Sequence, residues 1–204
     1  MKTNEKKVET GNLNINREST KGLRIGLVSF FILSLLILST NVTFAHCDTM
    51  DGPLIKDARK AMGQNNVNYV LKWVSAAKES EIRDAFNLVM KVKGLSREAK
   101  ELSEKYFFDT LVRIHREGEG EPFTGVKPSG TPVDDKVLAA DKSIETGNLA
   151  PLKDMVSKDI LPELTKRFDK VMSLKNFDVN NVEAGREYIE AYVQFFKFAE
   201  GEEE

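Results

Sequence analysis

Apolar residues in this 204-residue chain follow two patterns, one continuous and one periodic. The continuous pattern is the run "IGLVSFFILSLLILSTNV", residues 25–42, which contains no charged residue. Beyond it, apolar residues recur at spacings of three and four, and the first such group is Leu54, Ile55, Ala58, Ala61 and Met62. This spacing is typical of amphipathic helices, and no stretch alternates with a period of two. The pattern therefore predicts an all-α fold for the part of the chain that follows the apolar run.

Capping residues divide the periodic part into several helices. Gly52-Pro53 is expected to open the first helix, because proline favours the first helical position. Four other residues occupy N-cap positions ahead of apolar segments: Asn66, Ser96, Asn148 and Asp178.

The second half of the periodic part resembles the first half at a constant offset of 82 residues. Without gaps, the segment from about Ala58 to Tyr106 aligns with the segment 82 residues later. Identical pairs recur along this alignment: Asn66/Asn148, Phe86/Phe168, Val89/Val171, Met90/Met172 and Lys93/Lys175. One offset held over such a span exceeds compositional chance and indicates two copies of one helical unit.

This offset predicts a domain organisation of two tandem helical repeats packed as one helical domain. We expect the first repeat over residues 46–117 and the second over residues 134–200. A Gly/Pro-rich linker, residues 118–133, joins them, and an acidic tail, residues 201–204, follows.

The first 45 residues differ from the rest and predict export. Residues 1–24 contain six basic and three acidic residues, and the apolar run follows them. "TFA", residues 43–45, then places small residues at the −3 and −1 positions before His46. This is the layout of a signal peptide, so we expect cleavage after Ala45 and export to the periplasm or the extracellular space. The competing interpretation is an uncleaved membrane anchor over residues 25–44, because about 20 apolar residues span a bilayer.

Charge and cysteine content limit the possible partners. The whole chain has a formal net charge of −2, and it becomes more acidic after loss of the basic first 45 residues. This balance argues against a nucleic-acid partner, which requires a basic face. Cys47 is the only cysteine and has no partner for an intramolecular disulfide. In an exported protein it is therefore expected to be buried, bound to a metal or paired with a second chain.

His46 and Cys47 are the candidate metal ligands. Cleavage after Ala45 would give His46 a free α-amine beside its imidazole, and the two groups can chelate one ion. The amide and thiolate of Cys47 would add two more donors. Such a mixed nitrogen and sulfur set suits nickel or copper in square-planar geometry. The alternative is a frayed terminus in which the histidine and the cysteine are incidental.

The letters "HCD" at this expected start resemble the metal hook of nickel-containing superoxide dismutase. That hook binds nickel through the terminal amine, the histidine, the amide and thiolate of a first cysteine, and a second cysteine four residues later. His46 and Cys47 match it, whereas Asp51 stands where the second cysteine belongs. The resemblance covers about three residues and implies a redox-active metal site that lacks one thiolate.

A second resemblance covers most of residues 45–200. The segments "AHCDTMDGP", "YFFDTLVRIHREGEGEPFTG" and "NVEAGREYIEAYV" are similar to a family of exported helical proteins of unknown function. This resemblance implies a helical fold and export, and it implies no particular activity.

His115 is the only other histidine and the candidate third metal ligand. It lies in the last turn of a predicted helix, on the same face as Phe108 and Val112. A cation at that position also stabilises a helix C-terminus, and the repeat-equivalent residue is Lys197. A role in helix stabilisation is therefore the alternative.

Asp48 and Asp51 are further candidate metal ligands, or hydrogen-bond acceptors that orient His46. For Asp51, capping of the helix that begins at Pro53 is the favoured interpretation.

Three functions are compatible with these residues. The protein is a redox metalloenzyme acting on superoxide or peroxide, a non-catalytic metal carrier or sensor, or a structural or partner-binding helical protein without a metal. The sequence contains no nucleophile elbow, phosphate-binding loop or zinc-binding cysteine pair. It leaves open whether the protein is an enzyme and which oligomeric state it adopts.

Overall fold

The computed structural model describes residues 46–201. The predicted signal peptide or anchor, residues 1–45, and residues 202–204 of the acidic tail lie outside the described residues. The described part contains eight α-helices and no strand, so the all-α prediction is confirmed. Its only β-type pairing is an isolated bridge between Thr49 and Lys127. Between residues 46 and 201, no helix is long and apolar enough to cross a membrane.

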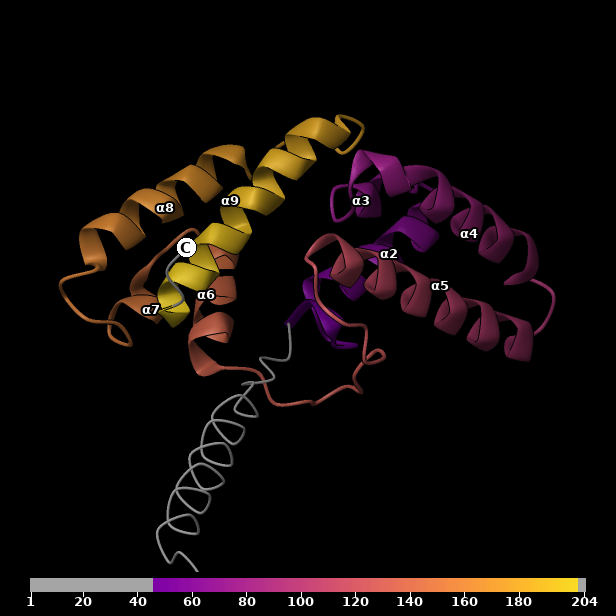
Figure 1. Cartoon of the computed structure of the whole chain (residues 1–204), viewed down its shortest axis with the longest axis horizontal. Helices are drawn as coiled ribbons and strands as arrows, with labels where there is room; N and C mark the ends of the chain where they lie inside the picture. The colour runs from indigo at the N-terminus through magenta and orange to yellow at the C-terminus, as the bar shows by residue number, and fades with distance from the viewer. Residues whose placement is uncertain (1–45, 202–204) are drawn as a thin grey trace, which may run out of the picture. The chain divides into compact units, whose positions relative to one another are not determined.

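The helices follow one another in two sets, before and after the segment 119–134. The first set comprises η1 (His46–Asp48), α2 (Pro53–Gln64), α3 (Asn68–Leu71), η2 (Ala76–Lys78), α4 (Glu79–Val92) and α5 (Arg97–Gly118). The second set comprises α6 (Asp135–Thr146), α7 (Ala150–Lys153), α8 (Leu161–Leu174) and α9 (Val182–Glu200). Helices α4 and α5 lie side by side, as do α8 and α9 (Figure 1).

The predicted caps are confirmed in part. Ser96 Oγ accepts a hydrogen bond from the Ala99 amide at 3.0 Å, at the start of α5. The Asn66 and Asn148 side chains accept from the first amides of α3 and α7, at 3.0 and 2.9 Å. The cap predicted at Asp178 is wrong. Its side chain accepts from the Asn180 amide within the preceding turn, and Asn181 caps α9 instead.

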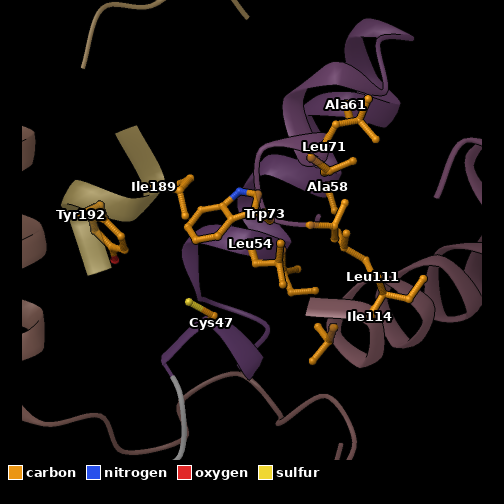
Figure 2. Close-up of a cluster of buried hydrophobic side chains, with 14 of the residues drawn as sticks. Cys47, Leu54, Ala58, Ala61, Leu71, Trp73, Leu111, Ile114, Ile189 and Tyr192 are labelled. Atoms are coloured by element: carbon orange, nitrogen blue, oxygen red, sulfur yellow. The ribbon is translucent and has the colours of Figure 1, made fainter. Parts of the chain in front are cut away.

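Aromatic pairs fill the core within and between the two sets. Phe86 packs against Phe107 and Phe168 against Phe195, each pair with ring centroids 5.7 Å apart. Trp73, which follows α3, packs edge-to-face on Tyr192 of α9 at 6.1 Å. Figure 2 shows this contact beside Ile189, in one continuous cluster of buried side chains. Helix α9 therefore packs against the first set as well as against α8.

Arg186 fastens α9 to the end of α3 and the start of α4. Its Nε donates to the Val74 carbonyl at 3.1 Å, and its Nη2 lies 2.5 Å from Glu79 Oε1. The side chain is 19% exposed, so these bonds are partly shielded from water. Next to it, a Cβ on Gly185 would lie 3.0 Å from the Lys72 Cβ, so a glycine permits this close approach.

Replacing Arg186 by alanine should destabilise the protein, because it leaves a carbonyl and a partly buried carboxylate without their donor. Hydrogen bonds of charged groups contribute roughly 1.5–3 kcal/mol each. We expect Arg186→Ala to lower the free energy of unfolding by about 2 kcal/mol, measured by urea denaturation. The control is Arg97→Ala, whose side chain is 81% exposed and should cost less than about 0.5 kcal/mol. Equal effects of the two variants would contradict this role.

Candidate functional site

The three residues of η1 are packed into the protein. His46, Cys47 and Asp48 are 8%, 4% and 3% exposed. The chain then turns sharply, because the amide and hydroxyl of Thr49 both donate to the His46 carbonyl, at 3.3 and 3.2 Å. A Cβ on Gly52 would lie 2.3 Å from that same carbonyl oxygen. Glycine is therefore required at this position for α2 to start so close to η1.

The segment between α5 and α6 runs along this turn. Backbone hydrogen bonds join the Lys127 amide to the Asp48 carbonyl at 2.8 Å and the Met50 amide to the Lys127 carbonyl at 2.9 Å. The exposed carboxylate of Asp51 accepts from Ser129 Oγ at 2.7 Å and from the Gly130 amide at 2.8 Å, and these bonds lower its pKa. The helix cap predicted at Asp51 is therefore wrong. The N-cap of α2 is Gly52, and Asp51 holds the following segment instead.

The imidazole of His46 is oriented by residues of the second helical set. Its Nε2 lies 3.3 Å from Asp141 Oδ2, and Tyr192 donates its hydroxyl proton to Asp141 Oδ1 at 2.7 Å. Burial lowers the pKa of His46, which favours the neutral ring. A neutral ring that donates from Nε2 leaves a lone pair on Nδ1. That Nδ1 is buried and has no hydrogen-bond partner among the described residues.

His115, near the end of α5, has a similar arrangement with the two nitrogens exchanged. Its Nδ1 lies 2.9 Å from the Trp73 carbonyl, which can only accept a proton. Its Nε2 lies 3.4 Å from Glu119 Oε1 and makes no hydrogen bond. In the neutral ring, a lone pair therefore stands beside a carboxylate oxygen. A cation between these two atoms would satisfy both.

Asp48 and Arg116 lie on the same side of the cluster as His115. The Arg116 Nε is 3.5 Å from Asp48 Oδ2, and its Nη1 is 2.9 Å from Glu119 Oε2. Burial raises the pKa of Asp48 to about 6, although Arg116 and His115 oppose this shift. Asp48 Oδ1 is buried without a hydrogen-bond partner among the described residues. This carboxyl group is therefore one of several polar groups at η1 that are incompletely paired.

Cys47 lies between these groups and the apolar core. Figure 2 shows its side chain in the cluster that contains Leu54, Trp73 and Tyr192. Burial raises the pKa of the thiol well above its usual value, and nearby carboxylates, among them Glu119 and Asp141, act in the same direction. The thiol is therefore protonated at neutral pH. It is also shielded from a second chain, which disfavours a disulfide-linked dimer.

The structure thus brings four of the five predicted site residues to one region and leaves the fifth outside it. His46, Cys47, Asp48 and His115 are all buried, whereas Asp51 is exposed and bonded to Ser129. Within residues 46–201, no three side chains of His, Cys, Asp or Glu are grouped closely enough to hold a metal ion. The α-amine is not among the donors here, because His46 is still joined to Ala45 in this chain.

Sequence analysis did not identify three residues that shape this region. Asp141 and Tyr192 lie about 95 and 146 positions after His46, and no local motif marks them. Trp73 was assigned only to the core, yet its carbonyl oxygen orients His115. All three contacts depend on packing between segments that are distant in sequence.

Comparisons with known proteins give a family without an assigned role. Residues 51–198 match the model of a family of unknown function, DUF6448. The matched span begins after His46, Cys47 and Asp48 and therefore includes only His115 and Asp51 of the predicted site residues. No curated protein and no solved structure matches the chain.

The stability difference between Asp48→Asn and the wild type should depend on pH. The pKa of Asp48 is about 6 in the folded protein and about 3.9 when unfolded, so the folded state binds this proton more tightly. The wild type therefore loses stability as the pH rises from about 4 to about 6, and asparagine does not titrate. Relative to wild type, the variant should be about 2 kcal/mol more favourable at pH 7 than at pH 4.

The measurement is urea unfolding at several pH values in the presence of EDTA. Asp169→Asn, at an exposed position of α8, is the control and should give the same difference at every pH. A pH-independent difference for Asp48→Asn would contradict the expected perturbation of this carboxyl group.

Proposed function

The chain belongs to a family of unknown function, DUF6448, and we propose from its own residues that it is an exported protein that binds one nickel or copper ion at His46 and Cys47. The observation that carries this proposal is the buried, unpartnered Nδ1 of His46, whose ring is oriented by Asp141. Histidines that bind metals commonly donate their other ring N–H to a carboxylate in this way. Buried polar atoms without a partner are rare and call for an explanation, and a metal ion supplies one.

Export would complete the ligand set at His46. Cleavage after Ala45 would create an α-amine on the residue that carries the unpartnered Nδ1, so that both donors chelate one ion. The carboxylates of Asp48, Glu119 and Asp141 act electrostatically on the neighbouring Cys47. Their negative charge would also stabilise a divalent cation.

Cys47 would contribute its amide and thiolate. The buried thiol is neutral without a metal, because its pKa is raised. A bound transition metal displaces the thiol proton, and metal affinity at this residue should therefore increase with pH.

His115 and Asp48 are proposed as the groups that complete the site from the α5 side. The Trp73 carbonyl fixes the His115 ring so that Nε2 is available, and the electrostatic effect of His115 on Asp48 indicates that the two are neighbours. Asp51 is not included in this ligand set, because Ser129 and Gly130 occupy its carboxylate. The missing thiolate of the nickel hook would then be replaced by an imidazole.

We further propose that the two helical sets are tandem copies of one unit. Helices α2, α3 and α4 begin at residues 53, 68 and 79, and α6, α7 and α8 begin at residues 135, 150 and 161. Equivalent side-chain bonds support the same offset, since Lys93 donates to the Met62 carbonyl and Lys175 to the Ile144 carbonyl. Only the first copy carries the proposed ligands, so the metal site would be a later addition to a structural repeat.

A second candidate function is structural, with an inert N-terminal plug. It is favoured by the packing of the Cys47 thiol against apolar side chains and by the absence of a grouped ligand set between residues 46 and 201. In this case η1 would only close the end of the core, and the mature protein would bind no metal.

Metal content of the exported product should distinguish these candidates. The complete chain is expressed in a host that exports it, and the product is analysed by intact mass and by elemental analysis. We expect a chain that begins at His46 and contains about one nickel or copper ion. His46→Ala should abolish metal binding, because it removes the imidazole of the chelate. Cys47→Ser should weaken binding at least tenfold, because it removes a thiolate ligand.

The matched control is Ser143→Ala, which alters a fully buried polar residue of α6 away from the proposed ligands. It should retain full metal content. A product that begins elsewhere, or copurified metal that is unchanged in both His46→Ala and Cys47→Ser, would rule out the proposed site. With metal bound, turnover of superoxide or peroxide separates a redox enzyme from a carrier.

His115→Ala tests the contribution of α5. If Nε2 of His115 binds the ion, the variant should lose metal affinity by tenfold or more, and the copper-loaded protein should lose nitrogen hyperfine structure in its electron paramagnetic resonance spectrum. His115→Gln restores hydrogen bonding without an imidazole and serves as the control for folding. An unchanged affinity and spectrum would remove His115 from the ligand set and leave the His46 chelate intact.

A further inference from the structure

His46 also lines a cavity that the proposed metal site does not use. The cavity has a volume of about 760 Å³ and is bounded by the start of α2, residues 131–133, α6 and α9. Cavities of roughly 300–1,000 Å³ are typical of sites for small organic ligands. Its size and position therefore make it a candidate binding site.

The charges around this cavity favour a positively charged ligand. Four carboxylates face it, against two ammonium groups: Asp51, Asp135, Asp141 and Glu145, with Lys56 and Lys142. Lys142 is paired with Glu145 at 2.8 Å, so one of the two cations is already neutralised. Clefts lined mainly by one sign of charge concentrate ligands of the opposite sign.

The wall of the cavity also offers aromatic and apolar surface. Tyr188 and Tyr192 of α9 are stacked with ring centroids 6.3 Å apart, and both line the cavity. Leu138 of α6 lies on the same lining and is 47% exposed. The ring of Tyr188 already lies 5.7 Å from the ammonium group of Lys72. Aromatic faces attract cations, so this wall suits a charged amine with an apolar body.

A hydrogen-bond acceptor without a partner belongs to the same lining. His46 is 8% exposed, its Nε2 is engaged by Asp141, and its Nδ1 has no partner among the described residues. An ammonium ligand donates hydrogen bonds and accepts none, which matches the acceptors available at this cavity.

We propose that this cavity binds an organic cation, namely an amine attached to an aromatic or aliphatic body. The carboxylates of Asp135, Asp141 and Glu145 would stabilise the ammonium group, and Tyr188, Tyr192 and Leu138 would contact the apolar body. This binding does not require a metal, and it extends the proposed role of the region around His46 from an ion to a small molecule.

The test compares three probes of similar size and different charge on the product of the complete chain, in EDTA at pH 7. The probes are 2-phenylethylamine, 2-phenylethanol and 3-phenylpropionate, and binding is measured by calorimetry and by NMR. We expect the amine to bind at least tenfold more tightly than the carboxylate, with the alcohol between them. Equal binding of the amine and the carboxylate, or binding of none of the three, would overturn the proposal.

Two variants localise the binding. Asp135→Asn with Glu145→Gln removes two exposed carboxylates of the cavity and should weaken amine binding three- to tenfold. Asp169→Asn with Glu190→Gln removes two exposed carboxylates outside the cavity lining and should leave it unchanged. Leu138→Arg places a positive charge on the lining and should abolish amine binding. Equal effects of the two double variants, or tight binding to Leu138→Arg, would assign the amine to another surface.

Discussion

The close approach of Gly52 to the carbonyl of His46 is the constraint on which the region around η1 depends. A Cβ at position 52 would lie 2.3 Å from that oxygen, and no rearrangement of a side chain can relieve a clash with backbone. Because glycine stands there, α2 starts directly behind η1 and holds His46 to Asp48 against the core. The His46 ring then reaches Asp141, and the Cys47 thiol enters the cluster around Trp73.

This arrangement leaves several polar atoms at η1 and α5 without partners. His46 Nδ1, Asp48 Oδ1 and His115 Nε2 are all buried and unpaired within the described part of the chain. Each such group costs roughly 1–3 kcal/mol, which is a substantial part of the stability of a small domain. A core built only for packing would place apolar side chains at these positions. All three unpaired atoms are acceptors or can be acceptors, so a cation is the ligand that would offset these costs together.

Prediction from sequence succeeds where the cause is local and fails where it depends on packing between distant segments. The all-α fold follows from apolar spacing, and Ser96 caps α5 because a cap depends only on the residues of the next turn. Asp178 and Asn181 are both good caps within four residues, and spacing alone does not decide between them. His46 and Cys47 stand out as rare residue types. Asp141 and Tyr192, which orient His46, do not, because acidic and aromatic residues occur throughout the helices.

The two helical sets differ most where the proposed chemistry lies. At an offset of 82 residues, the positions equivalent to His46, Cys47 and His115 are Pro128, Ser129 and Lys197, which form no comparable ligand set. The second set instead supplies Asp141 and Tyr192, which orient the first histidine and face the adjoining cavity. Residues of both sets therefore meet at His46, and Arg186 and Trp73 hold the sets together beside it. If the sets arose by duplication, the region around His46 is the one place where the second copy acquired a role that the first does not have.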